Sequence, residues 1–139
     1  MLQINDSFTK VFRLSQEDVN TFARISGDQN PVHLDKAYAK NTPYKKPIIH
    51  GFLAGSVFSR IIGMEFPGEG TVYLKQNLVF RRPMYVDTDY QAVLTITEID
   101  SRRGNAKIDT RILGLEDQKP TITGEAWVMN KEKLSSSEG

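Results

Sequence analysis

The chain has 139 residues, a length typical of a single domain that can bury a hydrophobic core. It contains no cysteine, which excludes disulfide bridges, thiolate metal sites and a thiol nucleophile. Eighteen basic and seventeen acidic residues leave a net charge of +1, which argues against a nucleic-acid-binding protein that relies on a broad positive surface.

The N-terminal part of the chain is predicted to hold a strand and a helix. Residues 7–14 favour a strand, and residues 16–26 carry apolar side chains at helical spacing. Ser15 can cap this helix, with Asp18 three residues later. A further short helical turn is expected over residues 36–41.

A longer helix is predicted over residues 51–63. Its apolar side chains cover most of the circumference, so we expect it to be buried on most sides. The pattern then changes to strands, which are predicted over residues 71–80, 89–100, 105–113 and 121–129. One buried helix followed by four long strands indicates an α+β fold, in which a curved antiparallel β-sheet wraps around a long central helix.

The domain organisation follows from these elements. Residues 1–130 are predicted to form a single domain. Residues 131–139 are charged and then serine-rich, and we expect a disordered C-terminal tail there. No apolar run approaches the roughly 20 residues that span a bilayer, and the first residues lack the order of a signal peptide. We therefore expect a soluble protein of the cytoplasm.

The loop after the first helix carries the most informative side chains. It places a carboxylate, Asp28, and an imidazole, His33, close together, and such a pair can share a water for general acid/base chemistry. Gly27 would end the helix before the loop, and Pro31 stiffens the loop beyond Asn30. The alternative is a helix C-cap followed by an Asx-type turn, with His33 merely exposed.

Three ordered segments connect this loop to a known family. The segment 22–39 resembles the signature of the R-specific enoyl-CoA hydratases (hydratase 2, the MaoC-like group) at Phe22, Ile25, Ser26, Gly27, Asp28, Asn30, Pro31, Val32, His33 and Ala39. Residues 47–59 are similar to the entry into the long central helix of the hot-dog fold, and residues 70–83 to the strand that follows it. The resemblance covers the chain from about residue 7 to about residue 129.

The resemblance implies a hot-dog fold and the reversible R-specific hydration of a trans-2-enoyl-CoA to an (R)-3-hydroxyacyl-CoA. This chemistry needs a base for water, an acid for C2 and a donor for the thioester oxygen. Asp28 and His33 are the expected acid/base pair, and which of them holds the proton at rest stays open. No separate cofactor and no metal are expected, because coenzyme A is part of the substrate. The family also implies a homodimer. The balanced charge and the lack of a long apolar run predict that the protein contacts neither nucleic acid nor membrane.

Gly51 is the candidate oxyanion donor. It stands at the start of the central helix, where the first N–H groups lack intrahelical partners and the dipole favours developing negative charge. The alternative is that Gly51 only relieves crowding where the helix meets the sheet. For His50, next to Gly51, a structural hydrogen bond near the helix start is favoured over a catalytic role.

Other residues are expected to support the site or to bind substrate. Asn30 would orient the loop or the water, or form only an Asx-type turn. Ser59 could meet the loop from the central helix, although a hydrogen bond back to Gly55 is the simpler explanation. Ile62 and Trp127 would narrow the acyl pocket, which predicts a preference for short acyl chains; the alternative is that Trp127 packs at the dimer interface or under a loop. Basic residues that could contact the phosphates of coenzyme A are Lys45, Lys46, Lys75, Arg81, Arg82, Arg102 and Arg103.

Two alternative functions and one alternative kind of site remain open at this point. A thioesterase on the same scaffold would direct an activated water at the thioester carbonyl. A non-catalytic acyl-CoA-binding module would not require both Asp28 and His33. A metal site can be drawn from His33, His50, Asp28 and Asp35, although no typical ligand spacing supports it.

Overall fold

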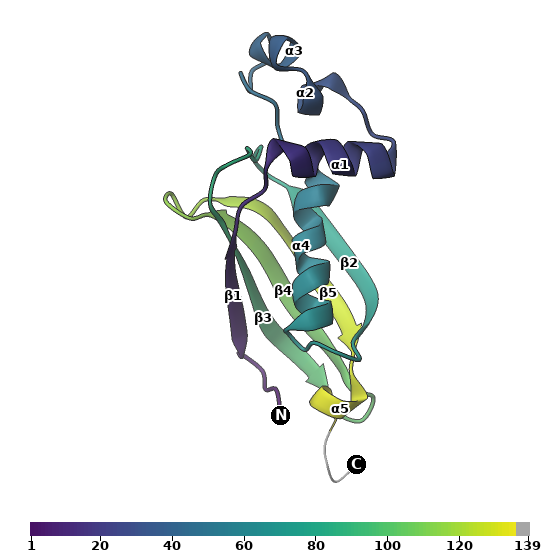
Figure 1. Cartoon of the computed structure of the whole chain (residues 1–139). Coiled ribbons are helices and arrows are strands. Elements are labelled where there is room, and N and C mark those ends of the chain that lie inside the picture. The colour runs from purple at the N-terminus through teal and green to yellow at the C-terminus, as the bar shows by residue number, and fades with distance from the viewer. Residues whose placement is uncertain (136–139) are drawn as a thin grey trace.

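Five antiparallel strands form one sheet, and a long helix lies across one face of it (Figure 1). The computed structural model describes residues 1–135. In chain order its elements are β1 (Ser7–Phe12), α1 (Gln16–Ser26), α2 (Pro31–Leu34), α3 (Lys36–Lys40), α4 (Gly51–Met64), β2 (Val72–Phe80), β3 (Tyr90–Asp100), β4 (Asn105–Gly114), β5 (Pro120–Met129) and α5 (Lys131–Leu134). The strand order is β1-β3-β4-β5-β2, so β1 and β2 are the edge strands. This arrangement is the predicted α+β hot-dog fold.

The core lies between α4 and the sheet. Ala54, Phe58, Ile61 and Ile62 of α4 are buried, and they pack with the alternate residues of β3, β4 and β5 that face the helix. The alternation in β5 is the predicted one, with Ile122, Ala126 and Val128 buried on a single face.

The prediction that α4 is buried on most sides is wrong for the single chain. Phe52 is 72% exposed and Met64 is 74% exposed, and Ser56, Ser59 and Arg60 are exposed as well. One sheet can cover only one side of a helix, so the remaining apolar residues of α4 stay uncovered. The edge strand β2 also exposes five apolar residues, Val72, Tyr73, Leu74, Val79 and Phe80, of which Phe80 packs against Phe52 of α4.

The helix α1 begins and ends at the predicted residues. Ser15 and Asp18 form a reciprocal capping box at its start. Gly27 adopts a positive φ of 81° at its end, a left-handed conformation that glycine adopts without strain. The short helix α2 was not predicted, although its start is ordinary: the Asn30 side chain accepts a hydrogen bond from the Val32 N–H, and Pro31 occupies the first turn.

The prediction of a disordered tail over residues 131–139 is wrong for residues 131–134. Residues 131–134 form α5, which the Asn130 side chain caps, and Leu134 is 1% exposed. The Lys133 Nζ donates to the Pro67 carbonyl at 2.8 Å, which ties this segment to the loop after α4. Leu134 and these hydrogen bonds together dock the segment, and residues 136–139 lie outside the described part of the chain.

The described helices are too short to cross a membrane. The longest, α4, has 14 residues, and no helix within residues 1–135 combines the length and apolarity that a membrane span requires.

Candidate active site

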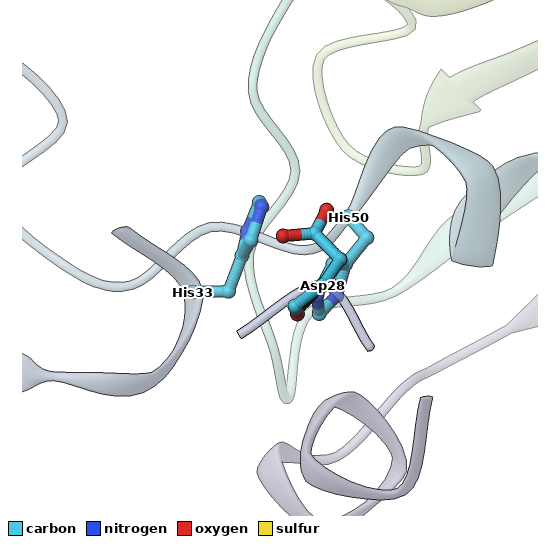
Figure 2. A group of neighbouring side chains, drawn as sticks. All are labelled: Asp28, His33 and His50. Atoms are coloured by element: carbon cyan, nitrogen blue, oxygen red, sulfur yellow. Dashed lines mark hydrogen bonds between the residues drawn. The ribbon is translucent and has the colours of Figure 1, made fainter. Parts of the chain in front are cut away.

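Three side chains from separate elements converge at the N-terminal end of α4. Asp28 comes from the loop after α1, His33 from α2, and His50 directly precedes α4 (Figure 2). A carboxylate oxygen of Asp28 and one ring nitrogen of each histidine all lie within 4.8 Å of one another. The structure thus brings the predicted pair Asp28 and His33 together, and it adds His50 to them.

The loop that carries Asp28 is held by a series of short-range hydrogen bonds. The Asp28 N–H donates to the Ser26 hydroxyl at 3.1 Å, and the Asn30 N–H donates to the Asp28 carboxylate at 3.2 Å. The Asn30 side chain accepts in turn from the Val32 N–H at 3.1 Å. Asn30 therefore forms the Asx-type turn that was the alternative to its orienting the loop or the water.

The His33 imidazole is half-buried, and its tautomer is set by the main chain. Its Nδ1 lies 2.7 Å from the Ile48 carbonyl oxygen. Because a carbonyl can only accept, Nδ1 carries the hydrogen, and the Nε2 lone pair is left to act as a base. Burial lowers the pKa of His33 below its ordinary value of 6.5, against the opposing effect of the Ile48 hydrogen bond. The neighbouring His50 lowers the pKa further, whereas Asp28 raises it.

His50 is the part of the site that sequence reasoning undervalued. Its side chain is 2% exposed, and its ring stacks on the His33 ring with centroids 3.8 Å apart. Its Nε2 lies 3.0 Å from the main-chain carbonyl oxygen of Asp28, which is the structural hydrogen bond that was favoured. In the sequence, the only signal for His50 was its position next to Gly51. Its contact with Asp28 could not be predicted, because residues 28 and 50 are far apart in the chain.

Gly51 is the first residue of α4, and no side chain among residues 1–135 caps this helix. The first N–H groups of α4 are therefore available for a ligand with negative charge. Packing also favours glycine here, because a Cβ at this position would lie 2.6 Å from the Phe80 ring. Gly51 lines a cavity of about 350 Å³ together with Tyr44, Ile48, Arg81 and Arg82. Both predicted roles of Gly51 thus have a structural basis.

The remaining predicted residues are not all brought to this cluster. Ser59 lies on the exposed side of α4. Ile62 is 1% exposed in the core between α4 and the sheet. Trp127 lies on the opposite face of the sheet, with the Lys75 Nζ at 4.5 Å and the Lys107 Nζ at 5.5 Å from its ring centroid. Within one chain, Ile62 and Trp127 therefore do not border a common pocket.

The donor set Asp28, His33 and His50 is close enough to hold a metal ion. Asp35 was the fourth ligand of the metal site considered from the sequence. Its carboxylate instead accepts a hydrogen bond from the Tyr38 N–H at 3.1 Å and caps α3. Each histidine also directs one ring nitrogen to a main-chain carbonyl, so each can offer only its other nitrogen to a metal, beside the Asp28 carboxylate.

Comparison with known proteins agrees with the resemblance drawn from the sequence. A family model described as a MaoC-like domain matches residues 5–116. The (R)-specific enoyl-CoA hydratase of Aeromonas caviae is 38% identical over 116 residues, which cover 84% of this chain and 86% of that protein. A mitochondrial 3-hydroxyacyl-[acyl-carrier-protein] dehydratase of Arabidopsis thaliana is 30% identical over 99% of this chain and 84% of its own length. The solved structure of an (R)-hydratase from A. caviae involved in PHA biosynthesis superimposes with a TM-score of 0.88 and 35% identity, covering 92% of this chain and 96% of that one.

Proposed function

We propose that this chain, which belongs to the MaoC-like domain family, catalyses the reversible R-specific hydration of trans-2-enoyl-CoA to (R)-3-hydroxyacyl-CoA. The observation that carries the proposal is the convergence of Asp28 and His33 beside the uncapped start of α4. An acid/base pair and a set of free N–H groups are what this reaction needs in one place.

The proposed reaction divides the work among three groups. The Asp28 and His33 pair takes a proton from a bound water as its oxygen attacks C3 of the substrate, and returns a proton to C2. The Gly51 N–H holds the thioester oxygen while it gains enolate character. Because both proton transfers come from one side of the double bond, H and OH add to the same face. Neither a metal nor a separate cofactor is required for these steps.

The hydration assay that tests this proposal uses crotonyl-CoA. We expect loss of the conjugated enone absorbance without release of free coenzyme A, which a thiol reagent would detect. Release of the thiol would instead support the thioesterase alternative, and tight acyl-CoA binding without turnover would support a binding module.

A first prediction concerns the pH dependence. A base must be neutral to accept a proton, and the lowered pKa of His33 keeps the imidazole neutral to lower pH than a free histidine. The acid limb of the kcat/KM profile for crotonyl-CoA is therefore expected to have its midpoint below pH 6.5. A midpoint at or above this value would argue against His33 as the base.

We further propose that Arg81 and Arg82 contact the phosphates of coenzyme A. They share the cavity with Gly51, and each also donates a hydrogen bond within the chain: Arg81 Nε to the Thr123 hydroxyl at 2.8 Å, and Arg82 Nη1 to the Pro120 carbonyl at 2.9 Å. Two other candidates, Lys75 and Lys46, lie over the aromatic rings of Trp127 and Tyr85. Arginine suits this task because its guanidinium matches phosphate geometry.

The prediction for this arginine pair is a defect in binding. Replacing both by glutamine should raise KM for crotonyl-CoA by roughly tenfold or more and leave kcat within about threefold, because the contact is made equally in ground and transition states. The N-acetylcysteamine thioester, which lacks the nucleotide, serves as the control substrate. An equal effect on both thioesters would assign the arginines to structure.

We also propose that the chain forms a homodimer through β2 and the exposed side of α4. Support comes from the unpaired edge of β2 and from the apolar residues that α4 and β2 expose side by side, such as Phe52 and Phe80. Pairing of two β2 edges would satisfy the free backbone groups and cover this apolar surface.

A matched pair of substitutions tests the dimer. Val79 on β2 and Val11 on β1 are 48% and 51% exposed, and they stand on opposite edge strands. In sedimentation velocity, wild type and Val11→Lys should be dimers, whereas Val79→Lys should shift toward monomer because lysine opposes burial at the interface. A monomeric wild type, or equal behaviour of the two variants, would contradict this interface.

A further inference from the structure

His50 is buried in the candidate site, yet the proposed reaction assigns it no step. Its ring lies between two others: the Phe22 ring, with centroids 4.8 Å apart, and the His33 ring, with centroids 3.8 Å apart and planes inclined by 26°. This nearly parallel stack restricts the plane of the His33 imidazole, and with it the direction in which the His33 Nε2 lone pair points.

The same ring also contacts the loop of Asp28. The Asp28 carbonyl can only accept, so the His50 Nε2 carries a hydrogen and donates it at 3.0 Å. His50 Nδ1 is then the bare nitrogen, and it is buried without a hydrogen-bond partner among the described residues. A single buried side chain thus contacts both members of the acid/base pair, which α2 and the preceding loop carry separately.

We propose that His50 is a positioning residue that holds Asp28 and His33 at the spacing where they share one water. The inference rests on the proposed function, because the spacing matters only if the two groups act together. His50 also directly precedes Gly51, so its ring links the acid/base pair to the start of α4. Positioning of this kind has large effects, since a misplacement of about 1 Å can cost roughly 10²-fold in rate.

The charged neighbours of His33 agree with this role. The titratable groups that face His33 within the described chain are Asp28 and His50, and the Phe22 ring behind His50 brings no charge. Burial and the charge repulsion between two stacked imidazolium rings both disfavour a protonated His33, which keeps His33 ready to accept a proton.

Two substitutions separate the two contacts of His50. His50→Phe retains an aromatic ring for the stack but loses the donor to Asp28, whereas His50→Gln retains an amide donor but loses the stack. Each variant should lower kcat for crotonyl-CoA by roughly 10–10²-fold and leave KM within about threefold, as expected for lost alignment. Phe22→Leu is the control, because it loosens the packing behind His50 without removing either contact, and it should stay within about threefold of wild type.

Nuclear magnetic resonance gives a readout that needs no turnover. The chain has two histidines, so in either variant the remaining imidazole signals belong to His33. The pKa of His33 should rise in both variants, because the lowering by His50 is lost. In ¹⁵N-labelled wild type above the imidazole pKa, His50 should be protonated at Nε2 and His33 at Nδ1.

These measurements can overturn the inference without ambiguity. Turnover within about threefold of wild type in both variants would refute it, as would a His33 titration that neither variant changes. If the variants fail to fold, the wild-type spectrum still tests the inference. A neutral His50 protonated at Nδ1 would refute it, because such a ring could not donate to the Asp28 carbonyl through Nε2. An inactive wild type with the expected tautomers would refute the proposed function and leave the geometry of His50 intact.

Discussion

Asp28→Asn and His33→Gln are each expected to fold and to lower the turnover of crotonyl-CoA hydration by roughly 10²–10⁴-fold or more. Asparagine is nearly isosteric with aspartate, and its side-chain oxygen can still accept from the Asn30 N–H, so the loop should keep its shape. Glutamine at position 33 cannot act as a base at neutral pH. Each substitution therefore removes a proton-transfer group and leaves the surrounding fold in place.

The double variant sharpens this expectation. If Asp28 and His33 act on one water, the combined substitution should cost little more than either single one, because residues that act as a unit are not additive. Asp35→Asn is a suitable control, since this carboxylate caps α3 and has no assigned role in the chemistry. Near wild-type hydration by Asp28→Asn or His33→Gln would remove that residue from the mechanism.

The second large effect is expected at Gly51, where the backbone N–H is the proposed oxyanion donor. Proline lacks this N–H but is tolerated at the first position of a helix. The residue before it, His50, already has φ −55° and ψ 134°, which suits a residue that precedes proline. Gly51→Pro should lower turnover by roughly 10²–10³-fold relative to Gly51→Ala, the usual cost of losing one oxyanion donor.

The alanine variant is the necessary reference for this comparison. Either substitution introduces a Cβ that would lie 2.6 Å from the Phe80 ring, so alanine reproduces this part of the crowding, and proline adds the two further carbons of its ring. Only proline also deletes the N–H. Equal turnover of folded Gly51→Ala and Gly51→Pro would assign Gly51 to packing alone.

Local patterns in the sequence were sufficient for most of the fold. The predicted bounds of α1 are those observed, and the four strands after α4 lie within one residue of their predicted ends. Capping residues, periodicity and turn signals act over a few positions, so a sequence shows them directly. The short helices α2 and α5 were missed because each has only four residues, too few to show a period.

What the sequence could not show depends on contacts between distant residues. Asp28 and His33 were found because they share one loop, whereas the contact of His50 with both exists only after the chain folds. Trp127 was assigned to the correct face of β5, but the alternation of a strand does not say which face meets α4. The exposed side of α4 shows the same limit, since periodicity identifies an apolar face but not the partner that covers it.

The most direct test of the account is the stereochemistry of crotonyl-CoA hydration by the wild-type chain. With chiral analysis of the product formed in D₂O, we expect (R)-3-hydroxybutyryl-CoA that carries deuterium at C2 on the same face as the new hydroxyl. This result would mean that one acid/base pair serves a single face of the double bond. An S product, addition to opposite faces, or release of free coenzyme A without hydration would contradict the account.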